Sequence, residues 1–127
     1  KEYYGGTKYL DPLITSNYWS NYLKNKEKCD LIICISHLGH KYKSDKISDL
    51  KLASLSNNID VIIGGHTHTF LEKAKLIKNI KNNDVIVNQA GWGALALGRI
   101  DLEFSKNNEK TNSLSVSDVS KKNYAKI

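Results

Sequence analysis

The chain has 127 residues, 40% apolar and 25% charged, which fits one folded domain and excludes a disordered or collagen-like chain. Its net charge of +6 comes from lysines spread along the chain with acids between them, and only Arg99 is an arginine. Because nucleic-acid readout uses clustered basic residues and arginine, we expect a solvated surface and no nucleic-acid partner.

The first predicted element is a helix that begins at Pro12. Asp11 is a good N-cap residue, and proline is favoured at the first helical position. Aliphatic and aromatic residues then recur at helical spacing and form one apolar stripe: Ile14, Tyr18, Trp19, Tyr22 and Leu23. We expect this stripe to pack in the core and the helix to end in the lysine-rich segment 24–28.

A β-loop-α-β unit is predicted next. Residues 30–35 and 60–63 are short runs rich in β-branched residues, typical of strands buried on both faces of an α/β sheet. Residues 44–56 carry apolar residues at helical spacing between them. The longest apolar run, residues 31–35, is far below the roughly 20 residues of a membrane span, so no transmembrane helix is expected.

Further strands are predicted over residues 85–90 and 97–104, separated by Gly91-Trp92-Gly93, with residues 78–84 as a polar connection. A weaker strand signal covers residues 114–119. The sequence contains no methionine and starts without a charged-then-apolar leader, from which we expect a piece of a longer protein.

Histidines follow both strands of the β-loop-α-β unit. His37 follows the first strand, and His66 and His68 follow the second. The carboxyl ends of adjacent parallel strands lie about 5 Å apart, and open α/β sheets place their sites there. We therefore expect these three histidines to converge on a metal site, whereas His40 is expected to be an ordinary loop histidine.

Spacing and glycines support a site for two metals. In extended backbone His66 and His68 would face the same way, about 7 Å apart, which suits one ligand to each of two ions about 3.5–4 Å apart. Gly64-Gly65 is expected to supply a sharp turn with positive φ and room for the close approach of another group.

Two segments resemble the calcineurin-like metallophosphoesterases: residues 30–39 (DLIICISHLG) and residues 59–68 (IDVIIGGHTH). The likeness continues through residues 87–91 and 97–102, so it covers roughly 29–104, and the 5'-nucleotidases are the branch it fits. Residues 4–12 further resemble exported metallophosphatases of Bacteroidetes type. The resemblance implies the C-terminal half of an αββα four-layer sandwich, with residues 1–127 as one partial domain whose N-terminal half is missing.

By this resemblance His37 and His66 bind one metal and His68 the other. The implied function is phosphomonoester hydrolysis, with a nucleoside monophosphate as substrate and two divalent ions of zinc, manganese, iron or cobalt as cofactors. A periplasmic or exported location is implied by family alone. The family also uses an Asp-x-His, a Gly-Asp-x-x-Asp and a Gly-Asn-His-Asp/Glu motif, and none of these occurs here, so no catalytic residue is named.

Two alternatives concern the partner of this chain and whether the chain is part of an enzyme. A separate 5'-nucleotidase C-terminal domain on another chain is one potential partner. The non-enzyme alternative is an inactive remnant that binds at most one metal weakly.

Other polar residues near the predicted strands are expected to be structural. Asp30 and Asp60 begin strands and would lie nearly 20 Å from the histidine end, so we expect them to be strand-start caps. A structural role is also favoured over pocket lining for Asn88, Gln89 and Trp92.

Overall fold

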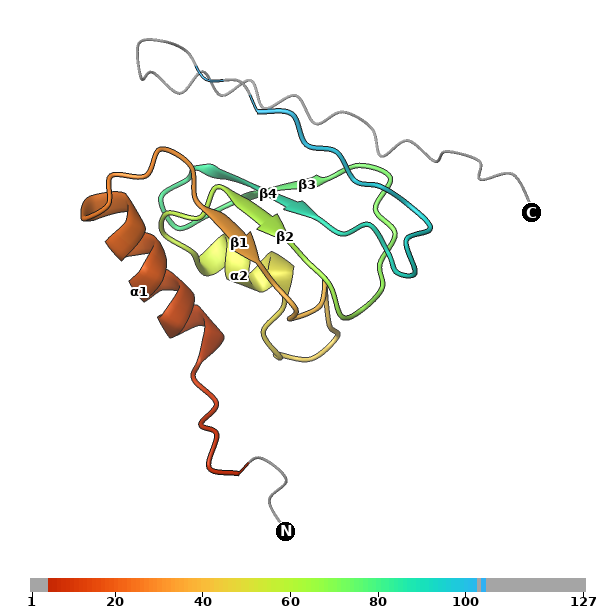
Figure 1. Cartoon of the computed structure of the whole chain (residues 1–127), viewed down its shortest axis with the longest axis horizontal. Coiled ribbons are helices and arrows are strands. Elements are labelled where there is room, and N and C mark those ends of the chain that lie inside the picture. The colour runs from red at the N-terminus through yellow and green to blue at the C-terminus, as the bar shows by residue number, and fades with distance from the viewer. Residues whose placement is uncertain (1–4, 103, 105–127) are drawn as a thin grey trace.

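The computed structural model describes residues 5–102 and residue 104 (Figure 1). Its elements are α1 (Pro12–Asn25), β1 (Ile33–Ile35), α2 (Asp49–Leu55), β2 (Val61–Ile63), β3 (Lys75–Lys78) and β4 (Asp84–Asn88). The strands form one sheet in the order β1-β2-β4-β3. β1, β2 and β4 are parallel neighbours, whereas β3 pairs with β4 in antiparallel orientation. The α/β class and the β-loop-α-β unit are therefore confirmed.

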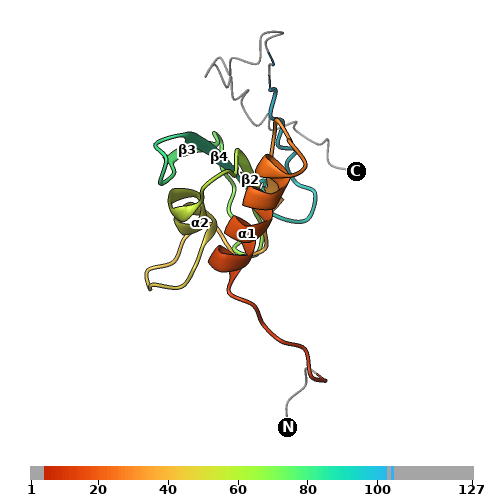
Figure 2. The same cartoon turned by 90° about the vertical axis from the view of Figure 1, so that its left-hand side faces the viewer.

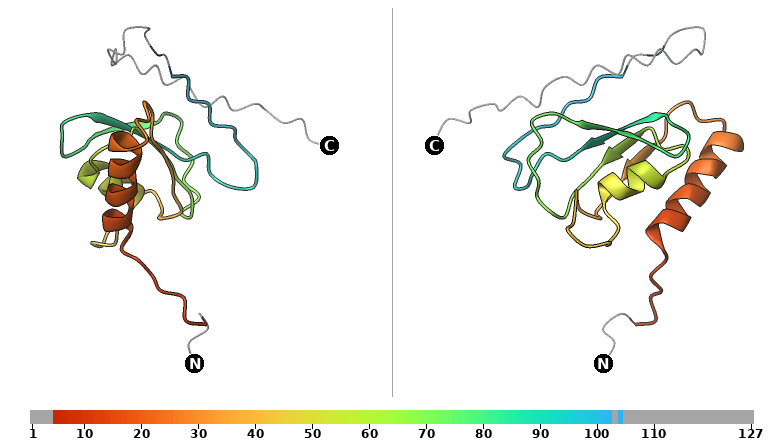
Figure 3. Two further views of the ribbon diagram at one scale, coloured as in Figure 1. Left: turned by 60° about the vertical axis from the view of Figure 1, so that its left-hand side comes forward. Right: turned by 180° about the vertical axis from the view of Figure 1, so that it is seen from behind.

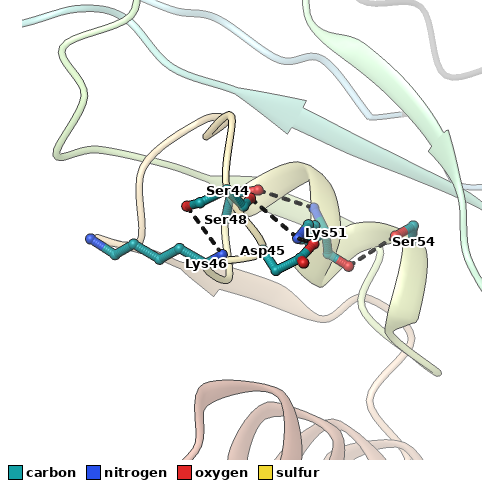
Figure 4. A network of polar contacts seen from close by, with 6 residues as sticks. All are labelled: Ser44, Asp45, Lys46, Ser48, Lys51 and Ser54. Atoms are coloured by element: carbon teal, nitrogen blue, oxygen red, sulfur yellow. Dashed lines mark hydrogen bonds and ion pairs between the residues drawn. The ribbon is translucent and has the colours of Figure 1, made fainter.

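Helix α2 starts later than residue 44, where the sequence predicts it. Its N-cap is Ser48, whose side chain accepts a hydrogen bond from the backbone N–H of Lys51 at 3.4 Å. The Lys51 ammonium reaches back to the Asp45 carboxylate at 3.0 Å and to the Ser44 carbonyl at 3.4 Å (Figure 4). Because serine side chains satisfy backbone groups locally, residues 44–48 form a capped loop instead of a first helical turn.

The core lies between α2 and one face of the sheet, and Figure 3 (right) shows α2 in front of the strands. Its fully buried members are Leu52, Ala53, Ile59, Ile62, Val85 and Val87. Ile62 pairs with Cys34 on one side and with Val87 on the other, so these three side chains share this face. We call it the helix-covered face.

The opposite face of the sheet, which we call the open face, is uncovered by the described residues along β1 and at the end of β2, whereas Val61 and Ile86 on the same face are buried. Ile33, Ile35 and Ile63 lie on it, and Ile35 is 87% exposed. The returning chain crosses it near β4, where a Cβ at Gly98 would lie 3.0 Å from the Asn88 amide nitrogen. The prediction of strands buried on both faces is therefore wrong for β1, because β1 is an edge strand covered on one side only.

Helix α1 begins as predicted, but its apolar stripe does not pack in the core. The Asp11 carboxylate accepts the N–H of Ile14 at 2.8 Å, and Pro12 is the first helical residue. Toward α2 the helix makes polar contacts, since the Asn17 amide donates to the Leu55 carbonyl at 3.2 Å, and Leu13 packs against the edge of the core. Figure 2 shows α1 beside α2.

The stripe of α1 points away from this polar contact. Ile14, Tyr18, Trp19 and Tyr22 are exposed, whereas Leu23 is partly buried. The Trp19 ring contacts the Tyr18 and Tyr22 rings edge to face. The prediction fails because Leu13 and polar side chains of α1, and not the exposed stripe, contact the rest of the described chain. Neither α1 nor α2 has the length and apolar character that a membrane span requires.

The later strands differ from the prediction in part. β4 covers most of residues 85–90, but β3 lies just before the predicted polar connection and was not expected. Asn79 makes this hairpin: its side-chain oxygen accepts the N–H groups of Lys81 and Asn83 at 2.9 and 3.0 Å. The described residues of 97–104 form no strand, and residues 114–119 lie outside the described part of the chain.

Candidate functional site

Two loops at the carboxyl ends of β1 and β2 carry the histidines. We call residues 36–40 the first histidine loop and residues 64–69 the second. Ile35 pairs with Ile63, and the Ser36 N–H donates to the Ile63 carbonyl at 2.8 Å, so the two loops leave the sheet side by side. The parallel pairing thus produces the convergence of loops that the sequence predicts.

His37 and His66 meet, and His68 lies apart from them. The imidazole centroids of His37 and His66 are 5.1 Å apart, with the rings nearly perpendicular. His68 instead stacks on Trp92, with centroids 5.8 Å apart and ring planes 20° apart. Among the described residues, no group of three or more His, Cys, Asp or Glu side chains is arranged to hold a metal ion. The geometry therefore gives one histidine pair and one separate histidine.

The second histidine loop is not extended, so the expected side-by-side orientation of His66 and His68 is wrong. His66 has φ +74° and His68 has φ +52°, in the left-handed region that non-glycine residues rarely adopt. The Thr67 N–H donates to the Gly65 carbonyl at 3.0 Å, which closes a tight turn around His66. Backbone of this kind persists only where surrounding contacts hold it.

The glycine pair serves close approach and not positive φ. Gly64 and Gly65 both lie outside the left-handed region. A Cβ at Gly64 would lie 2.0 Å from an Asp49 carboxylate oxygen, and a Cβ at Gly65 would lie 3.1 Å from Nδ1 of His37. The expected turn role is therefore wrong, whereas the expected close approach is confirmed.

A buried polar network underlies the two loops; the sequence does not single out its central residue Asp49, whereas it favours a structural role for the other central residue, Gln89. Asp49, the first residue of α2, is 0% exposed, and Gln89, directly after β4, is 1% exposed. The Asp49 carboxylate accepts the Ser36 hydroxyl at 2.6 Å and the Gln89 amide at 3.0 Å. The only sequence signal is a polar residue placed at the end of a buried strand.

The Gln89 amide spans the second histidine loop. Its nitrogen donates to the Gly65 carbonyl at 2.7 Å, and its oxygen accepts the Thr69 N–H at 2.9 Å. The Thr67 hydroxyl lies 3.2 Å from the same oxygen and accepts the His40 N–H at 2.9 Å. These contacts also link the two histidine loops to each other.

The remaining polar residues fall outside the histidine cluster. Asp60 is confirmed as a strand-start cap, because its carboxylate accepts the N–H of Ile32 at 2.9 Å. Asp30 is exposed at the same end of the sheet. Trp92 is 58% exposed against His68, so it borders the candidate site although the sequence favours a structural role for it.

Burial lowers the pKa of His40 below its ordinary value of 6.5, because the partly buried imidazole loses solvation when charged. The attraction of Asp49 opposes this shift without cancelling it. Nδ1 of His40 is buried without a hydrogen-bond partner. Neutral His40 is therefore the favoured form.

We expect an NMR titration of the His40 imidazole to give a midpoint below 6.5. Well above pH 6.5 the imidazole is neutral in both the folded and the unfolded chain. As the pH falls below it, the unfolded chain takes up the proton first, so the free energy of unfolding decreases. A midpoint at or above 6.5 would contradict this expectation, and the unfolded chain in urea provides the reference midpoint.

Comparisons with known proteins identify a family and several relatives of this chain. The family described as calcineurin-like phosphoesterase matches residues 2–70. Trifunctional nucleotide phosphoesterase protein YfkN of Bacillus subtilis is 38% identical over 84 residues, which are 66% of this chain and 5% of that protein. The 5'-nucleotidase of Vibrio cholerae is 33% identical over 122 residues, covering 81% of this chain and 22% of that protein. The chain thus spans about a fifth or less of these relatives.

Solved structures of nucleotidases are also similar to this chain. A 5'-nucleotidase precursor from Thermus thermophilus superposes with a TM-score of 0.67 at 29% identity, over 76% of this chain and 20% of that one. The NAD nucleotidase of Haemophilus influenzae superposes with a TM-score of 0.63 over 73% of this chain and 20% of that one. At 23% identity the second likeness concerns the fold alone.

Proposed function

The chain belongs to the calcineurin-like phosphoesterase family, in its 5'-nucleotidase branch, and from this premise we propose that it forms part of a metal-dependent phosphomonoester hydrolase. The observation that carries the proposal is the pair His37 and His66, whose rings lie 5.1 Å apart at the ends of adjacent parallel strands. Imidazoles that converge from two strand ends are suited to binding one divalent ion. The match of the family to residues 2–70 confirms, at the level of the family, the resemblance drawn from residues 29–104.

The donor set fits part of a dinuclear centre. In our proposal His37 and His66 bind one ion, and His68 binds a second. Neutral imidazole suits zinc, manganese, iron and cobalt alike, so the ligands alone do not select among these ions. When bound, two such ions activate water and neutralise the charge that develops on a phosphoryl group. Since no carboxylate joins the three histidines in the described residues, other ligands must complete the centre.

The chain's own contribution is to position these imidazoles. The Gly65 backbone leaves room for the His37 ring, because a side chain there would crowd Nδ1 of His37. Trp92 stacks on the His68 ring and limits its rotation. An imidazole held in this way reaches its ligand geometry with less loss of conformational freedom.

We propose a nucleoside 5'-monophosphate as the substrate, because the relatives include 5'-nucleotidases and a nucleotide phosphoesterase. The net charge of +6 adds a weak attraction for anionic substrates. A periplasmic or exported location belongs to the same proposal and rests on family likeness. A separate 5'-nucleotidase C-terminal domain would supply the nucleoside-binding surface if it lies on another chain.

Residues 1–127 form one partial domain in this proposal, the C-terminal half of an αββα sandwich. The open face supports this, because Ile33, Ile35 and Ile63 present apolar side chains that a second sheet would cover. The Vibrio cholerae relative and the Thermus thermophilus structure are about five times longer than the segments matched, which leaves ample chain for such a sheet.

The test is phosphate release from nucleoside 5'-monophosphates by the natural polypeptide that contains these residues. We expect activity to disappear on dialysis against a chelator and to return when zinc, manganese or cobalt is added back. The 127-residue chain alone is expected to release no phosphate. Metal-independent activity would overturn the proposed metal dependence, whereas a natural polypeptide that stays inactive with every ion would favour the inactive remnant over the enzyme.

A further inference from the structure

We propose that the buried pair Asp49 and Gln89 is a positioning device that holds both histidine loops in their site geometry. The pair bonds to backbone and hydroxyl groups of the two loops, so its effect on the histidine rings passes through these groups. The inference deepens the proposed hydrolase function and rests on it for its catalytic consequence. Its structural consequence can be measured in metal-free protein.

The contacts of Asp49 give the first step. Both carboxylate oxygens are used as acceptors, one for the Ser36 hydroxyl at 2.6 Å and one for the Gln89 amide at 3.0 Å. Ser36 precedes His37 directly, and its hydroxyl oxygen also accepts the N–H of Leu38 at 3.1 Å. The backbone on both sides of His37 is therefore tied to a fully buried carboxylate.

The contacts of Gln89 give the second step. Its amide bonds to the Gly65 carbonyl and the Thr69 N–H, which lie on either side of the two left-handed residues His66 and His68. Left-handed backbone at a non-glycine residue is strained and persists where neighbouring contacts fix it. Gln89 supplies such contacts at both ends of the strained turn.

The link between the two residues is the third step. Asp49 fixes which end of the Gln89 amide faces it, because a carboxylate accepts hydrogen bonds from the NH₂ group and repels the carbonyl oxygen. With the nitrogen held there, the oxygen must face Thr67 and Thr69. The Asp49 carboxylate thus sets the orientation of the Gln89 amide, which bonds to the second histidine loop. The same carboxylate bonds to the first histidine loop through the Ser36 hydroxyl.

Close packing of Gly64 supports this arrangement independently. A Cβ at Gly64 would lie 2.0 Å from an Asp49 carboxylate oxygen and 3.0 Å from the Gln89 amide nitrogen. The pair therefore sits directly against the start of the second histidine loop. The loop backbone thus packs against the pair at Gly64 and is hydrogen-bonded to Gln89 at Gly65 and Thr69.

The experiment compares Gln89→Met with Asn79→Leu in the natural polypeptide that contains these residues. Asn79 is the matched control, because it is also a buried amide whose oxygen and nitrogen bond to backbone groups, but it shapes the β3–β4 hairpin. Both variants replace an amide by an apolar group of similar size, so both should lower stability. Three quantities are measured: kcat and KM on a phosphomonoester, cobalt affinity, and hydrogen exchange of residues 64–71 in metal-free protein.

For Gln89→Met we expect faster exchange over residues 64–71 and cobalt affinity and kcat lowered by about 10- to 100-fold, because groups that orient metal ligands have effects of this size. KM should change less than kcat. For Asn79→Leu, exchange over residues 64–71 and cobalt affinity should stay at the wild-type level. If the two variants affect loop exchange equally, the positioning role is overturned.

A second pair of variants keeps the test decisive if Gln89→Met does not fold. Gln89→Glu places a carboxylate against Asp49, and adding Asp49→Asn restores one donor opposite one acceptor at that contact. The double variant should recover part of the slow exchange that Gln89→Glu loses. Absence of any recovery would contradict the coupling of the two residues. If wild-type protein binds no cobalt, the hydrolase proposal fails, while loop exchange still decides the positioning role.

Discussion

Replacing His66 by alanine is expected to lower kcat/KM for phosphomonoester hydrolysis by at least about 100-fold, because removing groups that merely orient metal ligands already has effects of 10- to 100-fold. His66 is the proposed ligand that shares an ion with His37, and its ring is the one that lies against His37. Losing it leaves a single imidazole where the structure provides two. The measurement is steady-state phosphate release by the natural polypeptide that contains these residues, at saturating zinc, manganese or cobalt.

His40→Ala is the matched control for this variant. His40 lies on the first histidine loop, close in sequence to His37, yet its ring is not part of the contact between His37 and His66. Its backbone N–H, which bonds to Thr67, is kept by the substitution. We expect activity within about 3-fold of wild type, as for a substitution that removes no ligand. Unchanged turnover in His66→Ala would remove the basis of the metal assignment.

The β-loop-α-β unit could be predicted from the sequence because its signals are local. Runs of β-branched residues and the helical spacing between them specify β1, α2 and β2, and parallel pairing then follows from the crossover. The same logic predicts that the two histidine loops leave the sheet together. What local signals do not contain is which side of an apolar element becomes covered, and both the stripe of α1 and the open side of β1 were mispredicted for that reason.

The candidate site likewise has features that local sequence signals predict and features that depend on tertiary packing. His37, His66 and the glycine pair were identified from type and position, because a strand end is a local feature. The contact between Asp49 and Gln89 joins residues 40 positions apart, so it depends on how α2 and β4 pack against the same loops. The left-handed backbone at His66 also lies where a distant residue makes contact, since the Gln89 amide donates to the carbonyl of the preceding Gly65.

Ile62→Ala should lower the free energy of unfolding by about 2–5 kcal/mol, the range for truncating a fully buried aliphatic side chain. Ile62 is 0% exposed and lies in β2, between β1 and β4. Truncating its side chain would leave a cavity between α2 and the sheet. The measurement is urea denaturation of the 127-residue chain. A loss below about 1 kcal/mol would mean that the helix-covered face is not a packed core.

Ile35→Ala is the companion variant, because it removes the same atoms from the open face. In the 127-residue chain its expected effect is below about 1 kcal/mol, since Ile35 is already 87% exposed and only strand preference is lost. If a second sheet covers the open face in the longer natural polypeptide, the same substitution should there approach the loss measured for Ile62→Ala. An equally small effect in both proteins would show that the open face stays uncovered. The difference between the two proteins therefore measures directly whether this chain is half of a sandwich, independently of any activity.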